Sequence, residues 1–153
     1  MSDVVWAINP RRDNVRDTIG RMRQHAEDVV SGRGVTLVFR APEGDENFHV
    51  PVNMRRDCFL IFKEALNNAV RHSGCRTVTI DIDTDGSRLH LRIADDGKGF
   101  DLQDPREGNG LDNMRRRARG MHGTLEVESA EGRGTTVRLS VPGSFVTRLR
   151  NPA

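Results

Sequence analysis

Three polar side chains recur at four-residue steps in the segment KEALNNAVRHSG, residues 63–74. Glu64, Asn68 and His72 would share one face of a helix, because residues four apart lie one above the other. Asparagine is a poor helix-interior residue, since its side chain competes for backbone hydrogen bonds. The stripe offers a carboxylate, an amide oxygen and an imidazole, which suit cation binding and proton transfer. The alternative is a solvated helix face with an incidental asparagine, and the stripe alone favours that alternative.

Magnesium is the metal that fits this stripe. It prefers oxygen ligands and keeps several waters, so a protein supplies one or two oxygens and a substrate phosphate supplies others. Asn68 provides one neutral oxygen, and Glu64 can accept a proton from an attacking group. Arg71 and His72, at the end of the same segment, can meet phosphate.

A second candidate segment is IADDGKGF, residues 93–100, where an apolar strand pattern leads into glycines. Asp95 would lie at the strand end, where a carboxylate can accept a hydrogen bond from an exocyclic amine. Gly97 and Gly99 let the backbone turn sharply and let a flat ligand approach. Taken by itself, the segment is better explained as an ordinary Asp-Gly turn.

Two further glycine pairs follow. GNGLDNM, residues 108–114, opens a helix, and the N–H groups at a helix N-terminus bind phosphate. It is not a dinucleotide-binding fingerprint, because Asn113 stands where that motif needs its third glycine, and the chain contains no P-loop. EGRGTT, residues 131–136, marks a hairpin in which Thr135 can offer a hydroxyl to a ligand, although a plain hairpin loop explains it equally well.

Periodicity predicts the elements that carry these motifs. Apolar residues three to four apart predict helices over 11–31, 53–72 and 111–123, ending near Ser31, Gly74 and Gly123. Residues 43–51 read as a polar connector. Alternating segments predict strands at 35–42, 76–84, 88–96, 124–129 and 134–142. The last four strands form two consecutive hairpins, the first turning at Asp85-Gly86. This order predicts an α+β two-layer sandwich, with a mixed or antiparallel sheet covered on one face by helices, rather than a doubly wound parallel sheet.

Composition limits the classes of function. With 153 residues, 35% hydrophobic and 30% charged, the chain suits one globular domain. No apolar run approaches the roughly 20 residues of a membrane span, and the first residues lack a signal-peptide pattern. The formal net charge of +2 argues weakly against general nucleic-acid binding. The basic run MRRRARG at 114–120 leaves a nucleic-acid patch as an alternative, but it has no interleaved aromatic residues, and a solvated helix face is the favoured interpretation. The chain has two cysteines, Cys58 and Cys75, which are too few for a structural zinc site. They indicate a reduced, cytoplasmic setting, and a disulfide between them is the less favoured alternative.

The order of the four motifs is more specific than any one of them. E-x-x-x-N, D-x-G-x-G, G-x-G-L and G-x-G-T follow one another along the chain. In this order the sequence resembles the ATP-binding domain of the gyrase, chaperone, histidine-kinase and mismatch-repair superfamily, over about residues 34–142. EALNNAVRHS and DDGKGF resemble the N box and first glycine box of bacterial sensor histidine kinases. The wording GL-x-NM-x-x-RA, at 110–118, is typical of the subfamily that partners LuxR-type response regulators.

The resemblance implies the Bergerat ATP-binding fold, with ATP and Mg²⁺ as ligands. It implies that Asn68 binds magnesium, Asp95 binds the adenine amine and Glu64 is the catalytic base or polarising residue. The other implied nucleotide-binding positions are Gly97 and Gly99 beside the base, Arg71, His72, Gly108 and Gly110 toward the phosphates, and Leu111 and Thr135. Residues 100–108 would form a short lid over ATP. One departure is His122, where related kinases carry a glycine before Gly123, and we interpret it as a tolerated surface substitution.

The implied activity is transfer of the γ-phosphate of Mg-ATP to a histidine on a separate dimerisation domain, in two-component signalling. None of the five histidines has the expected acceptor context, and His25 is interpreted as a structural helix residue. We therefore expect a linker and helix at 1–32 that follow a missing phosphoacceptor hairpin, a catalytic domain at 33–143 and a flexible tail at 144–153. The expected partners are that hairpin and a LuxR-type response regulator, with no nucleic acid and no membrane contact by this part.

Two alternatives remain at this stage. One is a serine kinase of the anti-sigma-factor type, whose motif spacing is similar. The other is a degenerate module that binds protein partners without catalysis. The presence of Glu64, Asn68 and Asp95 together argues against degeneracy. The expected location is the cytoplasm, including the cytoplasmic part of a membrane-bound sensor.

Overall fold

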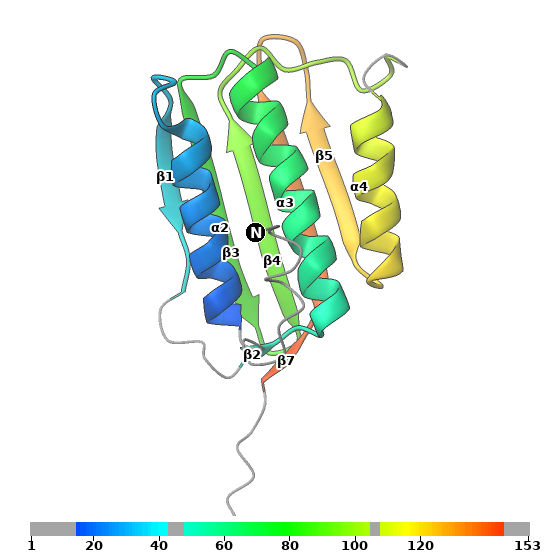
Figure 1. Ribbon diagram of the computed structural model, residues 1–153. Coiled ribbons are helices and arrows are strands. Elements are labelled where there is room, and N and C mark those ends of the chain that lie inside the picture. The colour runs from blue at the N-terminus through cyan, green and yellow to red at the C-terminus, as the bar shows by residue number, and fades with distance from the viewer. Residues whose placement is uncertain (1–14, 43–47, 105–107, 146–153) are drawn as a thin grey trace, which may run out of the picture.

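The computed structural model describes residues 15–42, 48–104 and 108–145 of the chain. In this part, three helices lie on one face of a five-stranded sheet (Figure 1). The elements in chain order are α2 (Val15–Val30), β1 (Thr36–Arg40), β2 (Phe48–His49), α3 (Val52–His72), β3 (Thr77–Asp85), β4 (Arg88–Asp95), α4 (Gly108–Gly120), β5 (Thr124–Ser129), β6 (Thr135–Pro142) and β7 (Ser144–Phe145). The predicted two-layer sandwich is confirmed.

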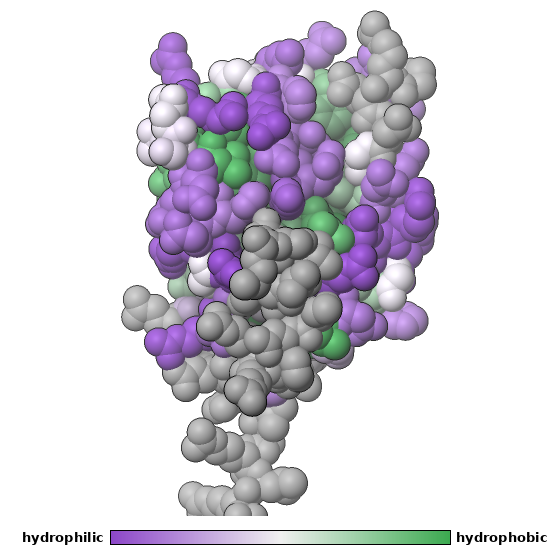
Figure 2. All heavy atoms as spheres, viewed as in Figure 1, coloured by the Kyte–Doolittle hydropathy of each residue, from purple (hydrophilic) through white to green (hydrophobic). Residues whose placement is uncertain are grey.

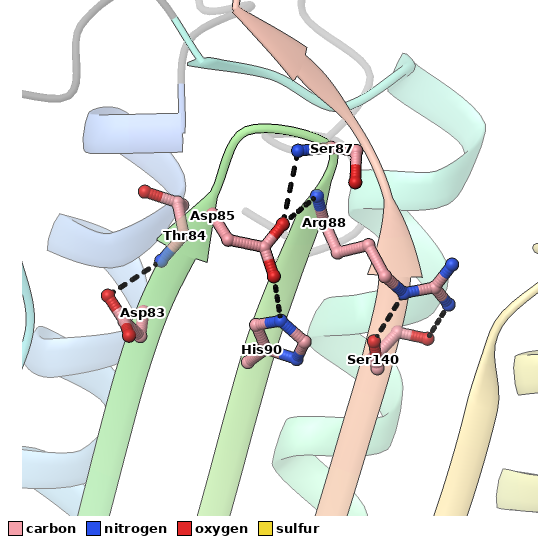
Figure 3. A network of polar contacts seen from close by, with 7 residues as sticks. All are labelled: Asp83, Thr84, Asp85, Ser87, Arg88, His90 and Ser140. Carbon is pink, nitrogen blue, oxygen red and sulfur yellow. Dashed lines mark hydrogen bonds and ion pairs between the residues drawn. The ribbon is translucent and has the colours of Figure 1, made fainter.

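The sheet is mixed, with strand order β1-β3-β4-β6-β5. β1 pairs with β3 in parallel, and the other neighbours are antiparallel. Parallel strands need a crossover connection, and α3 lies in the connection between β1 and β3. The first predicted hairpin is confirmed, since Asp85 pairs with Arg88 across a two-residue turn. Polar contacts around this turn include Asp85 with His90 and Arg88 with Ser140 (Figure 3).

The core lies between the sheet and the helices. Alternate residues of β3 and β4 face it, such as Ile80 and Leu91, and their neighbours face outward. α3 is the central helix, and its Phe62 and Leu66 are completely buried. Seen from the helix side, the surface is mainly hydrophilic, with small apolar patches (Figure 2). None of the helices in the described ranges is long and apolar enough to cross a membrane.

α2 belongs to the same core as the sheet. Its Val15, Met22 and Ala26 are buried in one cluster with α3 and the strands. The expected boundary after residue 32 therefore does not separate α2 from the folded unit. The His25 ring packs against Phe59 in a tilted arrangement, with 5.7 Å between ring centroids, in line with a structural role. Residues 1–14 lie outside the described part, and so does most of the expected linker.

The prediction of a polar connector over residues 43–51 was wrong at Phe48 and His49. Phe48 and His49 form β2, which pairs with Ser144 and Phe145 of β7. Phe48 is completely buried, and a Cβ at Gly143 would lie 2.5 Å from its ring. Two-residue strands carry no periodicity, so only contact between distant segments creates them. The expected flexible tail therefore begins no earlier than residue 146, and residues 146–153 lie outside the described part.

Helix ends differ slightly from the prediction. α3 begins at Val52, with Pro51 at the cap position and no side-chain cap. α4 begins at Gly108 and ends at Gly120, before the predicted Gly123. The chain leaves α4 through His122, which is exposed and has a φ of 56°, in the left-handed region that favours glycine.

Candidate functional site

A pocket of about 420 Å³ lies between α3, the end of β4, the start of α4 and β6. Each of the four motifs contributes to its wall. The lining residues are Glu64, Ala65, Asn68, Ala69, His72, Ser73, Ile93, Asp95, Lys98, Gly99, Phe100, Gly110, Leu111, Met114, Thr135 and Val137. A pocket of this size, with both apolar and polar residues in its wall, is the usual form of a small-ligand site.

The α3 stripe faces this pocket as its spacing predicted. Glu64, Asn68 and His72 all line it, because the apolar residues between them turn the opposite face of the helix toward the core. Asn67 is half-buried and does not line the pocket. Arg71 is exposed and also lies outside the lining, so the structure does not bring it to the predicted phosphate position.

Asp95 lies at the end of β4, half-buried in the pocket wall. Its carboxylate accepts the N–H of Gly97 at 2.9 Å. Burial raises the pKa of this carboxyl above its usual value, while hydrogen bonds from the backbone of Gly97 and Thr135 and from the Ser73 side chain partly offset the rise. A half-buried acceptor at a strand end can bind an amine on a flat ligand.

The next residue, Asp96, has a different role. Its carboxylate turns outward and accepts the N–H groups of Arg76 and Thr77, at 2.8 and 2.9 Å. These hydrogen bonds hold its pKa below the usual range. Asp96 therefore organises the start of β3, and of the two adjacent carboxylates Asp95 alone lines the pocket.

The glycines of this loop are needed mainly for packing. A Cβ at Gly97 would lie 2.5 Å from Ser73, and Gly97 does not line the pocket. Gly99 has a φ of +65°, and a Cβ there would lie 2.0 Å from the carbonyl oxygen of Ala130. The predicted reasons for both glycines were a sharp backbone turn and close approach of a ligand. The φ of Gly99 fits the first reason, and the atoms that a Cβ would meet belong to the protein's own backbone and to Ser73.

The start of α4 approaches the α3 stripe closely. A Cβ at Gly110 would lie 2.6 Å from Glu64 Oε1 and 3.8 Å from Asn68 Nδ2. Arg117 and Asp57, 3.2 Å apart, join the two helices farther along. Gly108 is the first residue of α4. Free N–H groups at a helix start, next to an amide and a carboxylate, fit a phosphate with its magnesium ion.

The hairpin of β5 and β6 closes the remaining side. The Thr135 hydroxyl hydrogen-bonds with Ser129 Oγ at 2.7 Å, and Ser129 Oγ accepts the N–H of Phe100 at 2.9 Å. Through these contacts the hairpin holds the first residue of the expected lid. Residues 105–107, the later part of that lid, lie outside the described part.

Sequence reasoning missed several wall residues. Ser73 and Lys98 were inside quoted motifs but had no assigned role, and the apolar residues Ile93, Met114 and Val137 lay in predicted strands and a helix without a role in the site. Hydrophobic periodicity marks such residues as buried without showing that a pocket adjoins them. No cluster of three or more His, Cys, Asp or Glu side chains occurs in the described ranges that could hold a metal ion.

Both cysteines are buried free thiols. Burial raises the pKa of Cys58 to about 12, so it is not a nucleophile at neutral pH. Cys75 lies just beyond the pocket, where its Sγ is 3.2 Å from the carbonyl oxygen of Ala69.

Much of the chain is similar in sequence to known proteins. Residues 54–144 match the family described as histidine kinase-, DNA gyrase B-, and HSP90-like ATPase. The sensor histidine kinase LiaS of Bacillus subtilis is 40% identical over 85 residues, which are 55% of this chain and 24% of LiaS. The sensor protein VraS of Staphylococcus saprophyticus is 39% identical over 98 residues, 63% of this chain and 28% of VraS. The chain thus spans about a quarter of the length of these curated relatives.

Solved structures support the same assignment. The histidine kinase domain of the blue-light activated kinase of Erythrobacter litoralis EL346 matches with a TM-score of 0.66 at 25% identity, covering 81% of this chain and 58% of that domain. Full-length ShkA in complex with AMPPNP shares the fold, with a TM-score of 0.67 at 16% identity, over 88% of this chain and 31% of ShkA. With its two-layer fold, its pocket and a family match over more than half of its length, the chain belongs to the histidine kinase-, DNA gyrase B- and HSP90-like ATPase family.

Proposed function

We propose that the chain is the ATP-binding catalytic domain of a two-component sensor histidine kinase. It would bind Mg-ATP and donate the γ-phosphate to a histidine on a separate dimerisation domain. The observation that carries the proposal is the convergence of four motifs, separated by up to about 70 residues in sequence, on one pocket. The similarity to sensor histidine kinases supports the choice within the family.

The two ends of the pocket suit the two ends of a nucleotide. Asp95 would accept the adenine amine, with Ile93 and Met114 providing apolar contact for the base. At the other end, Asn68 would hold magnesium, and the N–H groups of the first turn of α4 would receive the phosphates. When bound, the metal would supply charge neutralisation for the transferred group.

Glu64 is proposed as the base or polarising residue. Its carboxylate lies beside the start of α4 and one helical turn from Asn68. From there it would accept a proton from, or polarise, the incoming group. The rest of the catalytic effect would come from positioning by a rigid wall made of α3 and the sheet. The presence of Glu64, Asn68 and Asp95 around one pocket argues against a degenerate binding module.

Titration of the chain with a fluorescent ATP analogue, with and without magnesium, tests nucleotide binding. Wild type should bind saturably with magnesium, and Asn68→Ala should lose the magnesium-dependent part. Asn67→Ala is the matched control, because it makes the same change one residue away, outside the pocket wall. Absence of saturable binding by a folded wild-type chain would contradict the proposal, as would equal losses in the two variants.

Phosphotransfer needs a second experiment, since an acceptor is required. The chain would be mixed with a separately expressed dimerisation domain and labelled ATP. Acid-labile, base-stable label on histidine is expected, and label on serine would instead indicate the anti-sigma-type kinase.

The regulator class is a finer part of the proposal. The GL-x-NM-x-x-RA wording at 110–118 supports a LuxR-type response regulator as the downstream partner. We also propose a cytoplasmic location, where ATP and the regulator occur. Phosphate should pass from the labelled acceptor domain to a LuxR-type regulator faster than to a regulator of another class, and the reverse preference would refute this assignment.

A further inference from the structure

Ser73 occupies the junction between α3 and the loop that carries Asp95. It is the C-cap residue of α3, it is only 9% exposed, and it lines the pocket. Its hydroxyl donates to the carbonyl oxygen of Ala69 and accepts the N–H of Cys75 at 3.1 Å. Its own carbonyl accepts the N–H of Lys98 at 2.8 Å. Ser73 therefore holds the helix end and the D-D-G-K-G loop at once.

The same hydroxyl contacts the Asp95 carboxylate. The partners of that carboxylate are the backbone N–H groups of Gly97 and Thr135 and the Ser73 side chain. A hydroxyl has one proton and rotates freely, so it can donate to the Ala69 carbonyl or to the carboxylate. Of these three partners, only the Ser73 contact can be removed by changing a side chain.

The loop after Asp95 is packed against Ser73. A Cβ at Gly97 would lie 2.5 Å from the Cβ, the Oγ and the carbonyl oxygen of Ser73. Real Cβ atoms do not approach other atoms so closely, so glycine at 97 is what permits this packing. Position 73 thus carries a side chain and position 97 carries none, and this lets the Asp95 loop pack closely against the Ser73 hydroxyl.

We propose that Ser73 is a positioning residue that orients the Asp95 carboxylate toward the amine of adenine, and that selectivity for 6-aminopurine nucleotides depends on it. The inference rests on the proposed function, because it deepens the role of Asp95 as the acceptor of that amine. The competing explanation is that Ser73 only caps α3. In that case its loss would lower the affinities for all nucleotides by the same factor.

Two ligands that differ in one group separate these explanations. ATP carries the 6-amino group, and purine riboside 5′-triphosphate lacks it. Their affinities for the whole chain, with magnesium, can be measured by displacement of a fluorescent nucleotide. Ser73→Ala should weaken the affinity for ATP by about 5- to 10-fold, the size expected for one ordinary hydrogen bond, because Ser73 acts on the nucleotide only through Asp95. It should leave the affinity for purine riboside 5′-triphosphate nearly unchanged. The ratio of the ATP affinity to the purine riboside 5′-triphosphate affinity should therefore fall.

Cys75→Ala is the matched control. Cys75 is buried two residues away, and its thiol contacts the same Ala69 carbonyl as Ser73. Its removal should leave the affinity ratio at the wild-type value. If Ser73→Ala does not fold, Ser73→Cys replaces it, because a thiol keeps the shape of the side chain but is only a weak donor. A thermal melt identifies which variant to use.

Each outcome decides the matter. A smaller ratio in the Ser73 variant alone supports the inference. Equal weakening of both nucleotides, or the same change of ratio in Cys75→Ala, overturns it and leaves the nucleotide site intact. If the folded wild type binds neither nucleotide, the proposed function itself fails. If it binds both equally, Asp95 does not read the amine, and both the assignment of Asp95 and this inference fall.

Discussion

β4 begins and ends at an Asp-Gly turn, and the two turns share their local hydrogen bonding but differ in burial. Asp85 accepts the N–H groups of Ser87 and Arg88, at 3.1 and 2.9 Å, and contacts His90 Nε2 at 2.7 Å (Figure 3). Asp95 similarly accepts the N–H of Gly97, two residues on, at 2.9 Å. Both are Asx-type turns, as the residue types favour.

The pKa values of the two carboxyls shift in opposite directions. Asp85 is exposed, and its hydrogen bonds, above all with His90, lower its pKa to about 2. Asp95 is half-buried, and burial raises its pKa despite similar hydrogen bonds. The difference comes from the surroundings, because α3 and the β5–β6 hairpin cover the second turn. Local turn chemistry is thus common to both turns, and burial by distant elements makes only one of them part of a pocket.

The largest expected difference between the turns concerns their glycines. Gly99→Ala combines a left-handed φ with a Cβ 2.0 Å from the Ala130 carbonyl oxygen, so it should destabilise the fold by about 3 kcal/mol or more. Gly86→Ala is the control, since a Cβ there meets nothing within 4 Å and its φ is not left-handed. Urea unfolding of both variants checks this. Similar losses at the two sites would show that covering elements do not distinguish the turns.

The second difference concerns nucleotide binding. Asp95→Asn should weaken ATP by roughly 10- to 100-fold, the range for a lost hydrogen bond to a charged group, because the amide presents a weaker, uncharged acceptor to the adenine amine. Asp85→Asn makes the same chemical change at the distant turn and should leave ATP affinity unchanged. Equilibrium titration with ATP and magnesium measures both. Retained affinity in a folded Asp95→Asn chain would remove Asp95 from the proposed site.

The turn at His122 allows the cost of backbone strain to be measured without the cost of close atomic contacts. His122 has a φ of 56° and an exposed side chain, so strain is the main cost there. His122→Gly should raise the free energy of unfolding by about 0.5–1 kcal/mol, since relief of strain exceeds the added flexibility of the unfolded chain. This strain also gives a physical reason for the glycine that the resemblance led us to expect at this position. An unchanged or lower midpoint in urea would show that the turn at His122 is not strained.

The smallest effect is the pH dependence of stability. The pKa of Asp85 is lowered from its ordinary value of 3.8 to about 2, so its ionised form stabilises the native chain above pH 4 and this contribution disappears as the pH falls toward 2. Asp95 has the opposite sign, because its raised pKa lets the unfolded chain ionise first as the pH rises above 3.8. Thermal midpoints of Asp85→Asn and Asp95→Asn, each relative to wild type, should therefore change in opposite directions with pH. Parallel changes would contradict the assigned environments.

Much of the fold is determined by local pattern. Alternation over β3, β4, β5 and β6 and the three- to four-residue spacing of α3 were enough to predict these elements within a few residues. The faces were predictable too, because a helical period places Glu64 and Asn68 on one side, whatever packs on the other. The four motifs and their order likewise indicated a nucleotide site before any distance was known.

Other features depend on contacts between distant segments. The pairing of β2 with β7 has no local signal. Arg71 lies outside the pocket although its neighbour His72 lines it, because one residue rotates a helix position by about 100°. The role of Asp96 at the start of β3 had no sequence signal, since it depends on the N–H groups of Arg76 and Thr77, which bind its carboxylate.

Periodicity and side-chain chemistry along single segments were enough to predict the three helices, the five strands of the main sheet, their apolar faces and the residue types of the site. Tertiary structure alone decided which polar groups became buried together, such as Ser73 with Asp95. The physical reason is that burial, which sets a carboxyl's pKa and a glycine's necessity, is imposed by atoms many residues away. A one-dimensional pattern does not record that proximity.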